Sequence, residues 1–525
     1  MLSRRQFLAA LAASAVVGAC SDDSGGGGGS SSAAARRSTS TTGPLPRLDG
    51  SAFTLGVASG DPMPESVILW TRLATDPVGD GGMPDADLPV VWEVASDERI
   101  RDVVASGVAT ASPRLAHSVH VDATGLEPAR TYWYRFRVGE EESPVGRTRT
   151  APAADAEPER LRFAFLSCQD WQDGYWTAYP HLAGEDHDLV VFLGDYIYEG
   201  DRDPDKVRQH NSPRVQTLEA YRNRYGLYKG DPGLQAVHAA FPFVSTWDDH
   251  EVANDYGDKY DERGAPPAEF LRRRAAAYQA WYEHQPVRLE PPAGPDYRIN
   301  RTVPYGRLAA FHLLDERQYR SVPVCGADIG PICEEAEAPA RTLLGEQQEA
   351  WLADQLDSSE ATWDVLANSV ILSRTPVPIG DTVLYNLDQW DGFPPAQRRM
   401  LELLAERRDG NRVVITGDIH ASGVADMWRD FDDDSSPVIA TELVGTSVSS
   451  EFDESYLDIA EQAVRQAPWV QFFEARHRGY VAVEATSEAL RADFRFVATT
   501  DRPESTIETA STWAVEAGRP GAQEA

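Results

Sequence analysis

Four short apolar runs, each followed at once by charged or metal-ligating side chains, constrain the fold of this chain more than any other feature. They are LRFAFL (161–166), DLVVFL (188–193), FPFVSTW (241–247) and NRVVIT (411–416). Helical patterns such as 268–285 and 394–410 alternate with β-like runs of this kind, which indicates an α/β fold. Ligands of open α/β sheets bind beyond the carboxyl ends of the strands. We therefore predict that the side chains after these runs share one crevice.

The side chains that follow the runs are suited to binding cations. A structural role would explain each of them singly, because carboxylates cap helices and buried histidines are often satisfied core residues. It would not explain why so many ligating types gather at strand ends. The predicted metal ligands are Cys168 after the first run, Asp195 and Tyr198 after the second, Asp249 after the third, and Asp418 and His420 after the fourth, and His250 follows Asp249 in the same crevice.

The donor types indicate which metals fit. Zinc sites are rich in imidazole and thiolate, whereas this set offers mainly carboxylates with one phenolate and one thiolate. So many anions need high positive charge, which favours Fe³⁺ together with one or two Ca²⁺ over zinc or manganese. Asp195 has two carboxylate oxygens beside Tyr198, so we predict that it bridges metals roughly 3.5–4 Å apart.

Several neighbouring residues admit two interpretations from sequence. Some can contact metal or phosphate, or else cap helices and support the ligands through hydrogen bonds; these are Tyr196, Asp248, Glu251 and Asn254. Arg317 and Arg320 can hold phosphate oxygens, or can form structural ion pairs near Asp315 and Glu316.

Residues 1–20 have the pattern of an export signal. A twin arginine, Arg4 and Arg5, precedes an apolar stretch of about 13 residues, which is short of the roughly 20 residues that span a bilayer. The sequence VGAC at the end of this stretch is similar to a lipoprotein processing site and would leave a lipid on Cys20. Residues 21–48 are predicted to be a flexible linker. We therefore expect Tat export to the cell envelope, as a lipid-anchored or secreted protein.

The remaining cysteines and the net charge narrow the expected partners. Cys325 and Cys333 stand eight residues apart in a loop-like stretch, and in an oxidising compartment a disulfide is expected rather than two free thiols. The formal net charge of -34 argues against nucleic-acid binding and against membrane contact other than through a lipid anchor. We expect a monomer.

The chain reads as two domains. Short alternating strands over 49–152 predict a small β-sandwich of fibronectin or immunoglobulin type. Residues 158–500 carry the α/β pattern and all the predicted ligands, and the segment 501–525 is expected to be either a lid or a frayed end.

The motifs GDYIY (194–198), DDHE (248–251) and GDIHAS (417–422) resemble those of metallophosphoesterases of the calcineurin-like and purple-acid-phosphatase type. An ordered set narrows the resemblance to the alkaline phosphatase D (PhoD-like) family over residues 50–500. The set includes FTLGVASGDPMPESVILWTRL (53–73), LSCQDWQDGYWTAY (166–179), VSTWDDHEVANDY (244–256), LLDERQYRS (313–321), NLDQWDGFP (386–394) and ELVGTSVSS (442–450).

The resemblance implies a fibronectin-like domain followed by a metallophosphoesterase α/β sandwich, and phosphate-ester hydrolysis with iron and calcium. Cys168 and Tyr198 would ligate iron, and Asp195 would bridge. Asp249 stands where relatives have a metal-binding Asn, and Asp418 with His420 stands where many have a His-x-His pair. His250 would be the acid beside the leaving oxygen.

The sequence thus predicts an exported alkaline phosphatase or phosphodiesterase in which a metal-activated hydroxide attacks phosphorus and His250 protonates the leaving oxygen. Two alternatives belong to other functional classes. A zinc hydrolase of non-phosphate bonds should have a His-rich ligand set. A non-catalytic surface-binding protein would not need Cys168, Asp195 and His420 in register.

Overall fold

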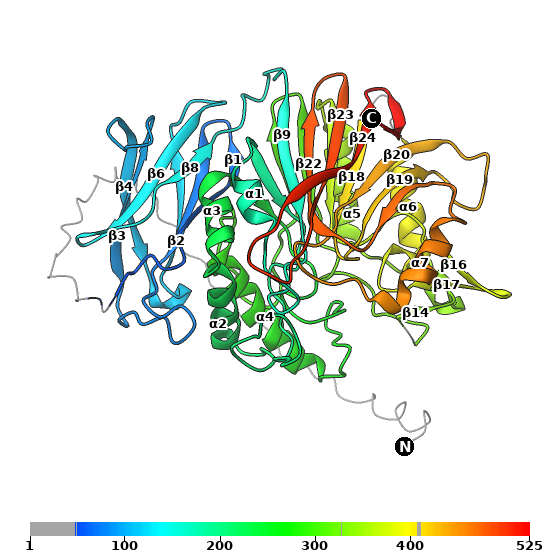
Figure 1. Ribbon diagram of the computed structural model, residues 1–525, viewed down its shortest axis with the longest axis horizontal. Coiled ribbons are helices and arrows are strands. Elements are labelled where there is room, and N and C mark those ends of the chain that lie inside the picture. Colours follow the sequence, from blue (N-terminus) through cyan, green and yellow to red (C-terminus); the bar gives the residue numbers. More distant parts are fainter. Residues whose placement is uncertain (1–47, 49, 327, 407–410) are drawn as a thin grey trace, which may run out of the picture. The chain divides into compact units, whose positions relative to one another are not determined.

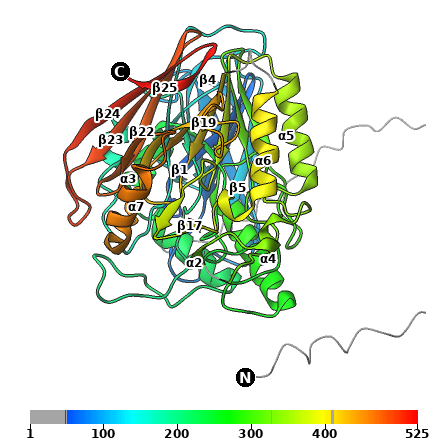
Figure 2. The same ribbon diagram turned by 90° about the vertical axis from the view of Figure 1, so that its right-hand side faces the viewer.

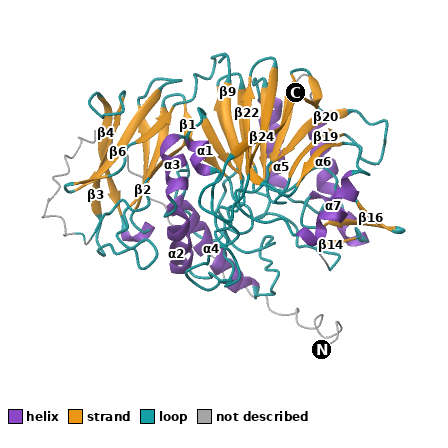
Figure 3. Cartoon of the chain, viewed as in Figure 1, coloured by secondary structure: helices purple, strands orange, loops and turns teal. Residues whose placement is uncertain are grey.

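Two large β-sheets stacked face to face, each covered by helices on its outer side, organise the structure (Figures 1 and 3). The computed structural model describes residues 48, 50–326, 328–406 and 411–525, and Pro46–Ala525 form one compact unit. The twin-arginine segment, Cys20 and the linker before residue 48 lie outside the described residues. Within the described chain, every helix is too short or too polar to cross a bilayer.

The first sheet has ten strands and carries three of the four predicted strand ends. Strands β9, β10 and β11 are neighbours and run parallel, and β1 pairs with β11 in the same direction. The order is β25 (Arg519–Glu524), β24 (Ile507–Glu516), β23 (Ala489–Val497), β22 (Arg478–Ala485), β9 (Leu161–Leu166), β10 (Leu189–Phe192), β11 (Pro242–Ser245), β1 (Val57–Met63), β2 (Ser66–Arg72) and β5 (Ser118–Thr124).

The second sheet has seven strands and carries the fourth strand end. Strands β13, β15, β18 and β20 run parallel to one another, β12 and β19 are antiparallel to them, and the edge strand β21 pairs antiparallel with β19. The order is β12 (Arg301–Tyr305), β13 (Ala309–Leu313), β15 (Trp363–Asn368), β18 (Asn411–Thr416), β20 (Val438–Val444), β19 (Ser422–Trp428) and β21 (Val470–Glu474).

Side-chain alternation along the strands builds three apolar layers. On β9, Phe163 and Phe165 enter the core between the two sheets, whereas Ala164 and Leu166 face the helices on the other side. Helices α1 (Tyr179–Ala183), α2 (Leu218–Lys229), α3 (Pro232–Ala240) and α4 (Pro267–His284) cover the first sheet. Helices α5 (Glu346–Ser358) and α6 (Pro394–Ala405) lie side by side on the second sheet (Figure 2), and α7 spans Leu457–Val464.

The β-sandwich over 49–152 shares a sheet with the rest of the protein. Its own sheet contains β4 (Val103–Ala111), β3 (Leu88–Ala95), β6 (Thr131–Val138) and β7 (Glu141–Glu142), with β8 (Gly146–Arg149) also paired to β6. This sheet packs its apolar face on β1, β2 and β5, which belong to the ten-stranded sheet. The sandwich is therefore continuous with the α/β part through the β1–β11 pair.

Short elements complete the chain. A three-stranded sheet contains β14 (Ile329–Gly330), β17 (Thr382–Asn386) and β16 (Val377–Ile379), and Cys325 forms a disulfide with Cys333 next to β14. Single 3₁₀ turns span Pro113–Leu115, Glu334–Glu337, Trp390–Gly392 and Glu454–Tyr456. The segment 501–525 contributes β24 and β25 to the edge of the first sheet.

Candidate metal centre

The predicted ligands lie in the loops that directly follow β9, β10, β11 and β18. Because β9, β10 and β11 are parallel neighbours, their carboxyl ends meet at one edge of the first sheet. The loop after β18 joins them from the second sheet: a Cβ on Gly417 would lie 2.5 Å from Ser167 Oγ. Such close approach allows side chains from both sheets to meet in one site.

Four of the predicted ligands adopt left-handed backbone conformations, which are uncommon for residues with a side chain. The φ angles are 58° at Cys168, 56° at Asp195, 62° at Asp418 and 56° at His420. Such conformations persist where the surrounding structure enforces them, and they concentrate at functional sites. Here they turn the chain sharply after each strand, so that the ligating side chains face one another.

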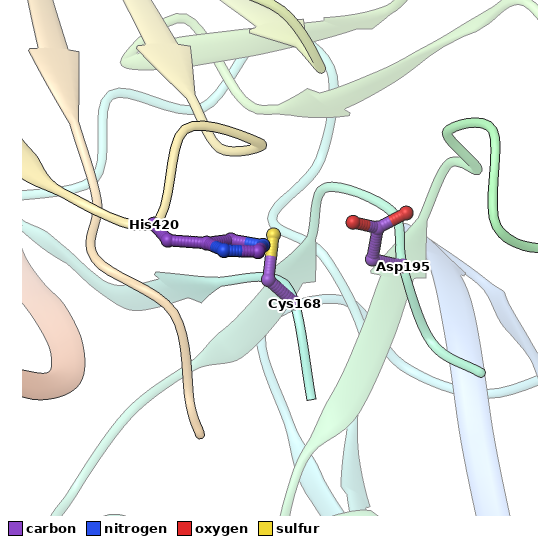
Figure 4. A group of neighbouring side chains, drawn as sticks. All are labelled: Cys168, Asp195 and His420. Atoms are coloured by element: carbon purple, nitrogen blue, oxygen red, sulfur yellow. The ribbon is translucent and has the colours of Figure 1, made fainter. Parts of the chain in front are cut away.

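One group of donors combines a thiol, a carboxylate and an imidazole. Ligand atoms of Cys168, Asp195 and His420 lie within 4.8 Å of one another, although the three residues come from different loops (Figure 4). The Tyr198 hydroxyl donates to Asp195 Oδ2 at 3.0 Å and lies 3.1 Å from His420 Nε2. His420 Nδ1 is 2.8 Å from the carbonyl oxygen of Glu451, so Nε2, which faces Tyr198, is the nitrogen that can ligate.

A second group of donors consists of carboxylates alone. Oxygens of Asp195, Asp248, Asp249 and Asp418 lie within 4.8 Å of one another. Asp249 Oδ2 accepts a hydrogen bond from the backbone of Asp255 at 2.6 Å, whereas its buried Oδ1 has no hydrogen-bond partner among the described residues. The Arg317 guanidinium lies 3.7 Å from this oxygen, beyond hydrogen-bond distance, so a bound cation would stabilise the buried carboxylate further. Asp195 belongs to both groups.

The electrostatics of the bare protein also favour a bound cation. Burial, reinforced by neighbouring carboxylates, raises the pKa of Asp195 and of Asp418 well above the usual range. Burial and the charges of Asp195 and Asp418 likewise raise the pKa of the Cys168 thiol, and burial raises that of the Tyr198 phenol. The ionised carboxylates, thiolate and phenolate, which are the forms that ligate metals, are thus unfavourable unless a cation is bound.

His250 forms a third group with Asp195 and Asp249, whose ligand atoms lie within 4.8 Å of one another, and two contacts fix the orientation of its ring. Its Nδ1 is 2.8 Å from Glu199 Oε2, and its ring stacks on Tyr198 with centroids 4.1 Å apart. Burial opposes a charge on this imidazole, but Asp249, Asp195 and Glu199 outweigh burial and raise its pKa well above the usual range. Burial likewise opposes the Glu199 charge, but the hydrogen bond and charge of His250 lower the Glu199 pKa to about 2.

The structure separates the neighbours that sequence left open. Asp248 joins the carboxylate group. Glu251 instead accepts backbone N–H groups of Asp195, Tyr196 and Asp248, at 3.1, 2.6 and 3.0 Å, so it fixes the loops. The Tyr196 hydroxyl lies 2.7 Å from His238, and the Asn254 side chain donates to Glu262 at 3.1 Å. Those two side chains therefore form hydrogen bonds outside the groups of possible metal ligands.

Arg317 and Arg320 form buried ion pairs. The Arg317 guanidinium donates to Asp248, to Asp388 at 2.7 Å and to Asp418 at 3.3 Å. Arg320 pairs with Asp388 at 2.7 Å. Because carboxylates engage both side chains, the structure favours ion pairs over a phosphate clamp, but with Asp248, Asp388 and Asp418 as partners instead of the neighbouring Asp315 and Glu316.

Sequence reasoning missed two supporting residues. Ser450 Oγ lies 2.8 Å from both the Tyr198 hydroxyl and the Cys168 carbonyl oxygen. Gln389 Nε2 donates to Asp418 Oδ2 at 2.7 Å. Both residues stand inside motifs that were noted for their resemblance, but a serine or a glutamine carries no ligand signal of its own.

Two family models and two relatives match most of the chain. A family model described as PhoD-like phosphatase matches residues 163–494, and one described as the PhoD-like phosphatase N-terminal domain matches residues 38–152. Alkaline phosphatase D of Bacillus subtilis is 45% identical over 484 residues, which cover 91% of this chain and 83% of that protein. A solved structure described as the structure of PhoD matches with a TM-score of 0.88 at 44% identity, covering 91% of this chain and 93% of that one.

Proposed function

Because this chain belongs to the PhoD-like phosphatase family and hydrolyses phosphoric ester bonds, we propose that it does so at a shared centre of Fe³⁺ and Ca²⁺. One observation carries the proposal: Asp195 belongs to two adjoining donor groups of different chemistry. Phenolate and thiolate suit a trivalent iron, whereas a group made only of carboxylates suits a hard divalent cation.

The residues divide accordingly. Cys168, Tyr198 and His420 would hold iron, Asp249 and Asp418 would hold calcium, and Asp195 would bridge. When bound, the ions supply positive charge to the phosphoryl oxygens and make water a better nucleophile. The chain itself orients the ligands through Ser450, Gln389 and the left-handed turns, and it neutralises surplus carboxylates with Arg317.

Metal analysis of the active protein, combined with an assay of phosphate-ester hydrolysis, tests this assignment. We expect iron and one or two calcium ions per chain, and loss of activity when either metal is removed. Zinc as the sole bound metal, or full activity without iron, would refute the assignment while leaving the family membership intact.

We also propose that His250 protonates the leaving oxygen. Glu199 engages Nδ1, so Nε2 is the nitrogen that can pass a proton to substrate. His250→Ala should lower kcat by roughly 10² to 10⁴ at unchanged metal content, with a smaller loss for substrates whose leaving group needs no proton. An equal loss for good and poor leaving groups would remove this role.

The location of the protein is a further part of the proposal and rests on sequence alone. The Arg4–Arg5 pair and Cys20 support Tat export followed by lipid anchoring. We further propose that the exported protein acts on a phosphate ester as a monomer. Replacing both arginines with lysine should retain the protein in the cytoplasm. Cys20→Ser should release it from the membrane fraction, and unchanged fractionation of either variant would refute the corresponding step.

A further inference from the structure

A large apolar cavity lies under α7. Its volume is about 600 Å³, and its walls come from α7, from β16 and β17, and from the strands β19 and β21. Apolar side chains dominate these walls, among them Leu384, Ala460, Val464, Phe472 and Phe473. A volume of this size is typical of pockets that bury most of a small organic ligand.

The cavity is continuous with the metal centre. Asp418 and His420, two of the proposed ligands, form part of its lining, and so does Gln389, which donates to Asp418 Oδ2 at 2.7 Å. The end of the cavity at Asp418 and His420 is therefore polar and anionic, and apolar side chains dominate the remainder, which also includes Arg374 and Asp453. A molecule that fills the cavity must combine a cation-binding group with an apolar group.

Exposed apolar side chains surround the same cavity. Tyr456 and Ile459 are 47% and 38% exposed, and Ile329 and Ile379 are 43% and 50% exposed. All four also line the cavity. Large apolar side chains that gather at a pocket, rather than scatter over the surface, indicate contact with an apolar ligand.

A second cavity has a more polar lining. It measures about 790 Å³ and carries Lys206, Arg476 and Arg478, and it shares Glu451 and Asp453 with the apolar cavity. None of the proposed ligands is among the described residues that line it. Because Asp418 and His420 line the apolar cavity instead, the substituent of a phosphate held there meets mainly apolar walls.

We propose that the apolar cavity binds a hydrocarbon chain of a phosphate diester whose phosphoryl group sits at the metal centre. The inference rests on the proposed function, because it assumes that the phosphate lies at Asp418 and His420. In the reaction, a water oxygen forms the new bond to phosphorus, the bond from phosphorus to the leaving oxygen breaks, and the protons of water end on the leaving alcohol and in solvent. The products are an alkyl phosphate monoester and the alcohol.

A chain-length series tests the proposal. The substrates are methyl, butyl, hexyl and octyl 4-nitrophenyl phosphate, each below its micelle concentration, and release of 4-nitrophenolate is measured. We expect kcat/KM to rise by roughly two- to fourfold per added methylene until the cavity is filled, mainly through a lower KM. Equal kcat/KM across the series would overturn the inference but leave the proposed function standing. Absence of hydrolysis for every ester would instead count against the proposed function.

A pair of variants on α7 tests whether the apolar cavity causes the dependence of kcat/KM on chain length. Ala460→Phe adds bulk inside the cavity and should reduce the octyl-to-methyl ratio of kcat/KM at least tenfold. Gln462→Phe adds the same side chain at an exposed position of the same helix that does not line the cavity, and should leave the ratio unchanged. If Ala460→Phe fails to fold, Ile459→Asn at the exposed rim should reduce the ratio severalfold. An unchanged ratio in a folded rim or cavity variant would overturn the assignment.

Discussion

Tyr196 and Tyr198, in the loop after β10, make different contacts although only one residue separates them. The Tyr198 hydroxyl contacts Asp195 and His420, whereas the Tyr196 hydroxyl contacts His238, outside both donor groups. Both side chains are buried. The pair therefore offers a test of phenolate ligation in which the control has the same chemistry, burial and loop.

Tyr198→Phe should abolish a visible absorption band of the iron-loaded protein, because a phenolate bound to Fe³⁺ gives a charge-transfer transition and phenylalanine cannot. Tyr196→Phe should keep the band. Absorption spectra of both variants, at matched iron content, check this prediction. A band of equal strength in Tyr198→Phe would show that the phenolate is not a ligand.

The identities of the proposed ligands were accessible from sequence because each follows an apolar run, and a strand delivers the residue after it to a known edge of the sheet. The comparisons confirm the family that the motifs suggested. The roles of Ser450 and Gln389 could not be predicted from sequence. Ser450 reaches the Cys168 carbonyl across 282 positions in the chain, and only the fold brings them together.

At the scale of elements, the turn after β10 depends on Gly194. Its φ is 115°, and a Cβ there would lie 2.5 Å from both the backbone nitrogen and the Cβ of Asp248. The loops after β10 and β11 can approach closely only because this side chain is missing. Asp195 and Asp248 owe their proximity to that approach.

Gly194→Ala should therefore lower the free energy of unfolding by about 2–4 kcal/mol and reduce metal content, because backbone must move and φ is strained. Gly200→Ala is the matched control in the same loop, since a Cβ there meets nothing within 4 Å. Denaturant unfolding and metal analysis of the two variants provide the measurement. Similar stability of both proteins would contradict the close approach.

In the β-sandwich, the strands could be predicted from sequence but their pairing could not. Alternating patterns indicate strands in 49–152, and the structure contains them, but pattern alone does not identify which strand pairs with which. Strand β1 pairs with β11, with Ser59 opposite Pro242. A partner so distant in sequence leaves no local signal, so the shared sheet could not be foreseen.

A partly buried histidine couples β5 to α4 and makes this contact sensitive to acid. His120 stacks on Tyr282 with centroids 4.3 Å apart, and its Nε2 lies 2.9 Å from the Gln285 carbonyl. Burial, assisted by the charge of Lys229, lowers its pKa to about 4. The folded protein thus keeps His120 neutral in a range where the unfolded chain protonates it, near pH 6.5 and below.

His120→Gln should test this coupling. Between about pH 6.5 and pH 4 the unfolded state of the wild type binds more protons, so the wild type loses about 2 kcal/mol relative to the variant, with little further change below pH 4. Other buried histidines titrate in both proteins and cancel. Unfolding free energies at pH 7.5 and 4.5 provide the comparison, and a difference that stays constant between them would contradict the neutral state of His120.

At the scale of the whole molecule, a net charge of -34 means that any added cation has two ways to stabilise the fold. It can screen repulsion over the entire surface, or it can bind the carboxylate group at the strand ends. These effects differ in their dependence on ion identity and on single residues. Calcium binding to one site stabilises by RT ln(1 + [Ca²⁺]/Kd), which is about 1.4 kcal/mol per tenfold increase above Kd.

For a protein of this size the site-specific effect should raise Tm on the order of 1–2 °C per tenfold increase in calcium after chelation, since Tm shifts less per kcal/mol in larger proteins. Asp249→Ala should remove most of this increment, because it deletes a buried carboxylate whose Oδ1 accepts no hydrogen bond among the described residues. Asp434→Ala changes the net charge equally at an exposed loop and should retain the increment. Thermal melts of the three proteins in calcium and in magnesium separate the two effects. If Asp249→Ala kept the full calcium response, or magnesium matched calcium throughout, stabilisation would come from screening and the carboxylate group would not be a calcium site.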